Sequence, residues 1–312
     1  MSDKIGVVVP TNRPDEMVKF KEAWAPKLEE ANAQLYEITD DPDTWATIRS
    51  DLGRSAWIIP VRTDCIRSYG YLKALRDGCD VIVTLDDDVR PHEDNNPIID
   101  HVNNLNRKVE PDNWTRTLKE ESAPITRGLP MIRRVVLSHG LWSGVPDVPA
   151  TIQIQGYTFS MPSTFDNQII PRNKYFPMSG MNLAWHKGMT PFMYFGLQGS
   201  SILDPEQRWG VDRSGDILCG VMAKTMVDSI PGAAIHSGEP WVHHIRASDP
   251  IKNLELERTS EYLPYIFAVH LKGSTSYLEM AERLFHLDQP SKRYCRSLGL
   301  AMREWDELTK KG

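Results

Sequence analysis

Short apolar runs alternate with helix-like segments along the first part of the chain. Residues 5–9 (IGVVV) form a β-branched run that ends at a proline, which predicts a buried parallel strand. The stretch TNRP at residues 11–14 supplies a polar cap and then a proline, the usual opening of a helix. This helix is expected to pass through residues 17–24, and Pro26 is expected to kink it or end its first part.

The same alternation continues as far as residue 85. Residues 34–39 are typical of a second strand, and residues 56–61 form a third apolar run. Residues 65–77 predict a helix that Gly78 closes, and residues 81–85 (VIVTL) predict the next strand. This order favours an α/β fold with a parallel sheet and covered faces. In such sheets ligands bind outside the carboxyl ends of the strands.

The last part of the chain has a different pattern. From Tyr262 onward the apolar positions follow a helical period, and Ser276-x-x-Glu279 is a capping box at the start of one helix. We therefore expect residues 1–256 to form an α/β domain and residues 257–312 to form a helical C-terminal extension packed on it.

Composition narrows the classes of function. A net charge of −6 gives no field that would attract nucleic acid. The four cysteines stand alone without a CxxC pair, which argues against a zinc ribbon or a disulfide framework. No apolar run approaches the roughly 20 residues of a membrane helix, and the start MSDKIGVVVP lacks a signal-peptide core. We expect a cytoplasmic protein with no nucleic-acid partner and no membrane span.

Three aspartates follow the strand predicted at residues 81–85. Asp86, Asp87 and Asp88 repel one another, so a dry structural role without a cation is disfavoured. Mg²⁺ and Mn²⁺ take hard oxygen ligands and share their coordination shell with substrate phosphates. The alternative is a solvated turn that caps the next helix. The position at the end of a buried strand favours the metal interpretation.

Further candidate residues each carry a structural alternative. Arg67 could clamp a phosphate through two hydrogen bonds or form a surface salt bridge. Gly180 could allow a ligand to approach the backbone or belong to a buried turn. His243 or His244 could complete a metal shell or be structural, and Asp216 could be a base or a helix cap. No GxSxG motif indicates a serine nucleophile.

An ordered set of motifs indicates a family. In chain order they are VVVPTNR (7–13), ITDDPD (38–43), IRSYGY (66–71), VTLDDD (83–88), RGLP (127–130), SHGLW with VPD (138–147), FPMSGMNLAW (176–185), MYFGLQG (193–199), D-ILCGVMAK (216–224) and H-IRASDP with NLE (244–255). With these motifs the chain resembles the reversibly glycosylated polypeptides, known in plants as UDP-arabinopyranose mutases.

The resemblance implies a fold, an activity and a cofactor. It implies a GT-A-like, Rossmann-like nucleotide-sugar-binding fold. It also implies interconversion of UDP-arabinopyranose and UDP-arabinofuranose with a divalent cation, Mn²⁺ or Mg²⁺. Family members become glycosylated on an arginine, which corresponds here to Arg127. A second arginine of the family corresponds to Arg133 or Arg134. Assembly into homo-oligomers is a further expectation.

The resemblance also implies which residues bind the UDP-sugar and which bind the metal. We expect the UDP-sugar to be bound by Thr11, Arg13, Asp40, Arg67, Asp86 and Asp87. We expect the metal to be bound by Asp86, Asp87, Asp88 and His244.

Ring contraction needs three events. The bond from C1 to the diphosphate breaks, the ring oxygen leaves C1, and the hydroxyl on C4 attacks C1. A nitrogen of Arg127 attached to C1 would drive the second event through an iminium. A guanidinium is a poor nucleophile because its pKa lies above about 12 and its lone pair is in resonance. A carboxylate would have to take a proton during the attack, and Asp216 is our candidate for it. The metal would stabilise the departing UDP.

Two other functions remain open from the residues. The first is a glycosyltransferase that uses the same donor site and binds an acceptor along residues 92–175. The second is a self-glycosylating subunit without catalysis. The intact triplet at residues 86–88 argues against the second, since a dead protein need not keep carboxylates that repel one another.

Overall fold

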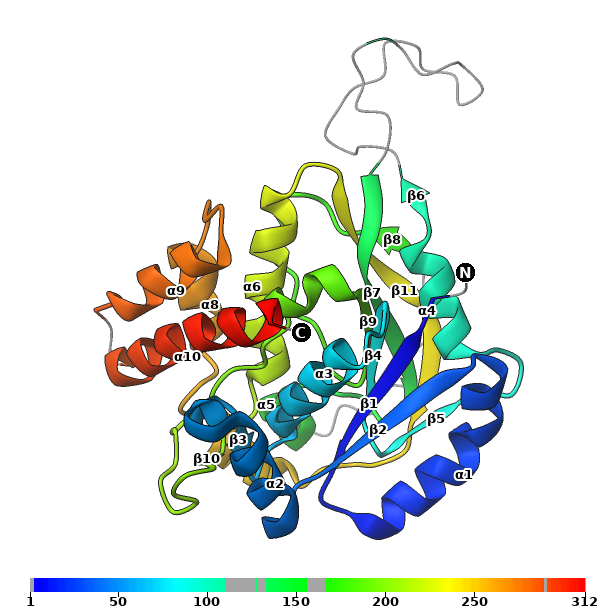
Figure 1. The fold of residues 1–312 in the computed structure, drawn as a ribbon, viewed down its shortest axis with the longest axis horizontal. Coiled ribbons are helices and arrows are strands. Elements are labelled where there is room, and N and C mark those ends of the chain that lie inside the picture. Colours follow the sequence, from blue (N-terminus) through cyan, green and yellow to red (C-terminus); the bar gives the residue numbers. More distant parts are fainter. Residues whose placement is uncertain (1–2, 110–126, 128–132, 156–166, 289–290, 312) are drawn as a thin grey trace.

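The computed structural model describes residues 3–109, 127, 133–155, 167–288 and 291–311. A twisted β-sheet runs through the middle, and helices cover both of its faces (Figure 1). The strands are β1 (Ile5–Thr11), β2 (Ala33–Thr39), β3 (Pro60–Val61), β4 (Val81–Leu85), β5 (Val89–Pro91), β6 (Lys108–Val109), β7 (Arg133–Gly144), β8 (Gln168–Ile169), β9 (Asn182–His186), β10 (Ser200–Ser201) and β11 (Ala233–His244).

Helices fill most of the remaining described chain. They are α1 (Pro14–Glu30), α2 (Pro42–Leu52), α3 (Arg67–Arg76), α4 (Pro97–Leu105), α5 (Ala150–Ile154), α6 (Gly215–Ser229), α7 (Pro250–Glu257), α8 (Leu263–His270), α9 (Tyr277–Phe285) and α10 (Lys292–Lys310). Three short 3₁₀ helices are η1 (Gly53–Ile58), η2 (Asp64–Ile66) and η3 (Lys187–Phe192). Among these helices, none combines the length and apolar composition that a membrane span requires.

The main sheet is mixed. Its order is β2-β1-β4-β9-β7-β11-β5, with β6 beside β7 and β8 beside β11. Strands β2, β1 and β4 run parallel, as predicted, whereas β9 lies antiparallel between β4 and β7. The predicted parallel arrangement therefore holds for β2, β1 and β4, whereas the antiparallel β9 makes the sheet as a whole mixed. A buried apolar run has the same composition in either direction, so its sequence does not reveal the direction. Strands β7 and β11 again run parallel to each other and to β4.

Each face of the sheet has its own core, because successive side chains of a strand point to opposite faces. Val7 and Val9 pack with α1, whose buried residues include Phe20 and Trp24. Val8 faces the other way and packs in the core that contains residues of α3, α6, α9 and α10. The prediction of covered faces is confirmed.

Most of the predicted elements are present, with two corrections. Strand β4 has the predicted bounds, and Gly78 follows α3 with a φ of 78°. Pro26 does not end α1, which continues to Glu30; the proline is exposed, so water can satisfy the carbonyl group that it leaves unpaired. The apolar run at residues 56–61 is largely η1, and its short strand β3 pairs with β10 outside the main sheet.

The C-terminal helices lie beside α6, on the opposite side of the molecule from α1 (Figure 1). One half of the predicted capping box is present, because Ser276 accepts a hydrogen bond from the Glu279 amide at 3.1 Å. The Glu279 carboxylate accepts from the amide of Thr275 at 2.8 Å instead of the amide of Ser276. Trp305 of α10 is fully buried and stacks on Tyr194 at 5.1 Å between ring centroids. The four cysteines are buried, and none of them forms a disulfide.

Candidate active site at the carboxyl edge of the sheet

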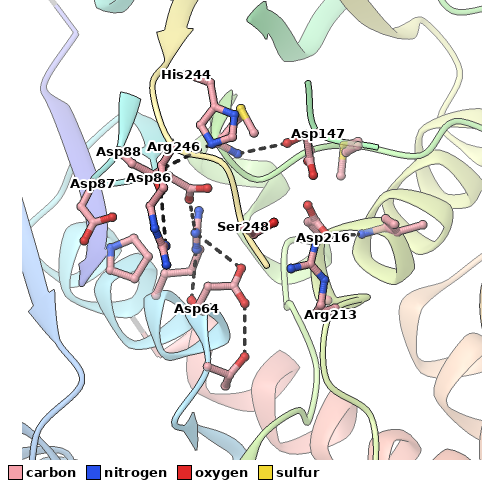
Figure 2. A pocket seen from close by; sticks show the side chains of 18 of the residues that line it. Asp64, Asp86, Asp87, Asp88, Asp147, Arg213, Asp216, His244, Arg246 and Ser248 are labelled. Carbon is pink, nitrogen blue, oxygen red and sulfur yellow. Dashed lines mark hydrogen bonds and ion pairs between the residues drawn. The ribbon is translucent and has the colours of Figure 1, made fainter. Parts of the chain in front are cut away.

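Five parallel strands end at one edge of the sheet, and their following residues enclose a cavity of about 630 Å³. The start of the antiparallel β9 reaches the same edge, since Asn182 pairs with Leu85. The cavity wall includes Thr11 from β1, Asp40 after β2, Asp86–Asp88 after β4, Asp147 after β7 and His244 from β11. Figure 2 shows Asp86, Asp87, Asp88, Asp147 and His244 around the cavity. These side chains therefore meet at the carboxyl edge of the sheet, where the sequence predicted that a ligand would bind.

The three aspartates have different partners. Asp86 forms an ion pair with Arg67. Asp87 is buried, and both of its oxygens are bonded, to Thr11 at 2.6 Å and to the guanidinium of Arg13. Asp87 thus ties the end of β4 to the end of β1 in this arrangement.

Asp88 lies among charges of both signs. Its carboxylate accepts a hydrogen bond from Arg13 at 2.9 Å and lies 3.8 Å from both Arg246 and the Nε2 of His244. Burial and the negative charge of Asp86 raise the pKa of Asp88, whereas Arg13 and His244 oppose that rise. The repulsion between two carboxylates at this point would be relieved by a cation.

Arg67 is fully buried, so the surface salt bridge considered for it is excluded. Its guanidinium donates to the carbonyl oxygen of Asp64 at 3.1 Å, to the hydroxyl of Thr84 at 3.0 Å and to the carbonyl oxygen of Gly180 at 2.7 Å. The remaining nitrogen is paired with Asp86. The donors are thus taken by protein acceptors, and Arg67 holds Asp86 in place rather than offering a free fork to a phosphate.

Gly180 makes this arrangement possible. A side-chain carbon at this position would lie 2.8 Å from Phe195 and 3.2 Å from the guanidinium of Arg67. The close approach is therefore between protein groups, which agrees with the buried-turn alternative.

His244, rather than His243, lines the cavity. The Nδ1 of His244 lies 2.8 Å from the carbonyl oxygen of Val145. A carbonyl oxygen only accepts, so Nδ1 carries the proton, and in the neutral ring Nε2 is the free nitrogen that faces Asp88. Metal-binding histidines commonly have this arrangement. His243 instead lies 3.2 Å from the hydroxyl of Ser143.

A metal ion would find an incomplete protein shell here. Within the described ranges, no group of three or more His, Cys, Asp or Glu side chains is arranged to hold a metal ion. Asp88 and His244 supply an oxygen and a nitrogen 3.8 Å apart. Mg²⁺ usually binds through one or two carboxylates and completes its shell with water and substrate phosphates. The donors at this edge therefore suit a cation that arrives with a diphosphate.

Asp40 lies in the cavity wall at the end of β2. It accepts hydrogen bonds from the indole of Trp45 at 2.7 Å and from the amide of Thr63 at 3.0 Å. Burial raises the pKa of Asp40, and these hydrogen bonds oppose the rise. Its carboxylate links β2 to the segment before α3.

Asp216 lies across the cavity from the triplet, in the first turn of α6 (Figure 2). It accepts hydrogen bonds from the amides of Gly180 at 3.0 Å and Ile217 at 2.8 Å, and Ser214 is the residue at the cap position. Burial, together with the charges of Asp64 and Asp147, raises the pKa of Asp216 to about 7. A carboxyl group with such a pKa can both donate and accept a proton near neutrality.

Several lining residues were missed by the sequence reasoning. Asp147 and Arg213 line the cavity beside Asp216, and Arg246 lies near Asp88. His139 also lines the cavity; burial lowers its pKa to about 4, so its ring is neutral. The motifs VPD and SHGLW contain Asp147 and His139, but nothing in their local pattern indicates that they meet Asp216.

Arg127 is exposed and is not among the residues that line the cavity. Its neighbours at 110–126 and 128–132 lie outside the described residues. Of the two candidates for a second arginine, Arg134 is exposed at the start of β7, and the side chain of Arg133 lies outside the described part.

Fold and cavity together define a Rossmann-like α/β protein with a cavity at the carboxyl edge of the sheet. More specifically, the chain belongs to the reversibly glycosylated polypeptide family, whose sequence profile matches residues 2–311.

Three curated relatives illustrate the similarity. UDP-arabinopyranose mutase 3 of Arabidopsis thaliana is 29% identical over 99% of this chain and 92% of its own length. UDP-arabinopyranose mutase 1 of the same plant is 28% identical over 99% and 94%. A probable UDP-arabinopyranose mutase 1 of Solanum tuberosum is 28% identical over 99% and 92%.

Proposed function

We propose that this protein is a UDP-sugar mutase that interconverts UDP-arabinopyranose and UDP-arabinofuranose. Relatives that match nearly the whole chain bear the name UDP-arabinopyranose mutase. The observation that carries the proposal is the cavity, which brings the acidic end of β4 and the carboxyl group of Asp216 together. One end of the cavity suits a cation and a diphosphate, and the other suits proton transfer to a sugar.

The proposed fold is of the GT-A type, with the nucleotide-sugar bound across the ends of β1, β2 and β4. Thr11, Arg13 and Asp40 line that part of the cavity together with Asp86 and Asp87. Because Asp87 and Arg67 are engaged by protein partners, we assign them to the support of the site, and Asp86 and Asp88 to the charged face toward the ligand.

We assign the cation, Mn²⁺ or Mg²⁺, to Asp88 and His244, with Asp86 beside them. When bound, it would neutralise negative charge on the departing diphosphate. His244 holds its free nitrogen toward this position because Val145 fixes the proton on the other one.

Asp216 is the proposed acid–base group of the ring contraction. Its raised pKa suits proton exchange with sugar hydroxyl groups near neutral pH. The glycosyl adduct on Arg127 is a separate hypothesis, and the role of Asp216 does not depend on it.

The deciding experiment incubates the purified protein with UDP-arabinopyranose and MnCl₂ and separates the products by chromatography. We expect UDP-arabinofuranose, and we expect EDTA to abolish its formation while Asp94→Asn, a change at an exposed residue outside the cavity, leaves it unchanged. Release of UDP only when an acceptor is added would instead identify a glycosyltransferase. In the same assay, full mutase activity in Arg127→Lys would exclude the covalent role of Arg127, and intact mass would report any arginine adduct.

A further inference from the structure

We propose that Asp147 is the second proton-transfer group of the isomerisation and acts together with the neighbouring Asp216. The inference rests on the proposed function and adds a catalytic residue to it. In Figure 2 the side chains of Asp147 and Asp216 lie next to each other on the side of the cavity that faces the triplet, Asp147 from the segment after β7 and Asp216 from α6. The negative charge of Asp147 also contributes to the raised pKa of Asp216.

The segment that carries Asp147 is held firmly. Two prolines, Pro146 and Pro149, flank it and fix their backbone φ angles. The preceding residue Val145 exchanges two hydrogen bonds with His244, at 2.9 and 2.8 Å. On the other side, the amide of Ala150 donates to Glu257 at 2.8 Å. The loop after β7 is thus tied to β11 and to α7, which places the carboxylate reproducibly.

The carboxylate of Asp147 is free to meet a ligand. Among the hydrogen bonds of the described residues, none involves its side chain, whereas the carboxylates of Asp86, Asp87 and Asp216 each have protein partners. The residue is accessible through the cavity, although protein atoms surround its carboxylate and raise its pKa. Arg213 and His244 oppose that rise. A carboxyl group with no protein hydrogen bond in such a position is suited to bind a hydroxyl group.

The reaction itself requires two groups. Conversion of the pyranose to the furanose breaks the bond between C1 and the ring oxygen and forms a bond between C1 and the oxygen on C4. The bond between C1 and the diphosphate, which breaks when UDP departs, forms again when UDP returns, so it does not change the net balance. One proton leaves the hydroxyl on C4, and one proton arrives at the former ring oxygen. A carboxylate that accepts the first and a carboxylic acid that donates the second balance the step, and no net proton, oxidant or reductant is needed.

The surroundings of the two carboxyl groups differ. Burial raises the pKa of Asp147, but the positive charges of Arg213 and His244 oppose that rise, so we assign Asp147 the role of accepting the proton from the hydroxyl group. Burial and two negative neighbours favour the protonated form of Asp216, so it donates to the ring oxygen. The two residues exchange roles in the reverse direction, as a reversible isomerisation requires. Enzymes commonly use two carboxyl groups in different environments in this way, one as the acid and the other as the base.

The test is Asp147→Asn, which keeps the shape and removes the charge. With UDP-arabinopyranose and Mn²⁺ we expect kcat to fall by about 100-fold or more, a typical contribution of one general acid or base. We expect the affinity for UDP with Mn²⁺, measured by calorimetry, and the thermal midpoint to stay near those of the wild type. Asp147→Glu should recover part of kcat, and Asp94→Asn should leave it unchanged.

A second measurement does not depend on turnover. In Asp147→Asn, carboxyl NMR titration should show a lower pKa for Asp216, because a negative neighbour is removed. If the wild type isomerises and Asp147→Asn keeps kcat within threefold, the inference is wrong and the proposed function stands. Loss of UDP affinity in parallel with kcat would make Asp147 a binding residue and would also overturn the inference. A wild type that isomerises no UDP-arabinose overturns the proposed function and the inference together.

Discussion

At the scale of single residues, Arg67 illustrates how a buried charge organises the site. Its guanidinium reaches the backbone of Asp64 and Gly180, the hydroxyl of Thr84 and the carboxylate of Asp86, and it lies 5.3 Å from the ring centre of Phe195. Such a buried pair adds little net stability, because desolvation offsets the attraction. The main effect of this ion pair is to fix the position of the Asp86 carboxylate.

Arg67→Met should be strongly destabilising, because it leaves Asp86 and two buried oxygens without their donors. We expect the free energy of unfolding to fall by about 3–5 kcal/mol, measured by urea denaturation. Arg76→Met is the matched control on the same helix, because Arg76 is half-buried at the surface and pairs with Asp51 at 2.7 Å. The free energy of unfolding of Arg76→Met should fall by about 1 kcal/mol or less. Equal losses in both variants would contradict the organising role of Arg67.

At the scale of secondary-structure elements, two opposing effects act on the ionisation of Asp216 at the N-terminus of α6. The positive end of the helix and the amides of Gly180 and Ile217 favour an ionised Asp216. Burial and the charges of Asp64 and Asp147 favour the protonated form, and they prevail, since the pKa rises to about 7. The helix therefore presents a carboxyl group that titrates near neutral pH.

This raised pKa predicts a pH dependence of stability. The folded protein holds a proton on Asp216 that the unfolded chain releases near the ordinary pKa of 3.8. Stability from this group is therefore present below about pH 4 and is lost as the pH rises toward 7. Between about pH 4 and pH 7, the free energy of unfolding of Asp216→Asn should therefore rise relative to that of the wild type, by up to about 4 kcal/mol. Urea denaturation between pH 4 and 8 measures the difference, which should be flat for Asp94→Asn. A flat difference for Asp216→Asn as well would show that its pKa is not raised.

At the scale of the whole molecule, the C-terminal helices share a core with the sheet. Trp305 of α10 stacks on Tyr194, and its indole donates to the carbonyl oxygen of Thr190 at 3.2 Å. The boundary predicted at residue 256 lies at the end of α7, where Glu257 bonds to the start of α5. These contacts predict that the helices after α7 unfold together with the α/β part.

Trp305→Ala tests this coupling. We expect a loss of about 3–5 kcal/mol, as for other buried aromatic residues, within a single unfolding transition. Leu300→Ala on the same helix is the control, since Leu300 is 44% exposed, and it should change stability by about 0.5 kcal/mol or less. Far-UV circular dichroism and tryptophan fluorescence should give coincident transitions. Two separated transitions would instead indicate an extension that folds on its own.

The sequence by itself determined the elements whose signals are local. Three kinds of signal depend on neighbouring residues alone, and the structure confirms them: the strands at residues 5–9 and 81–85, the glycine after α3 and the helix cap at Ser276. The ordered motifs likewise indicated the family. The expectation that the aspartates after β4 lie at a cavity followed from the rule for the carboxyl ends of strands.

Only the tertiary structure decided which distant residues share the site. The antiparallel insertion of β9 keeps β7 and β11 parallel to β4, so Asp147 and His244 end at the same edge as Asp86. The same packing buries Arg67 and raises the pKa of Asp216 through neighbours that lie far away in the sequence. Burial and charge act through space, and a local pattern of residues does not show which strands become neighbours.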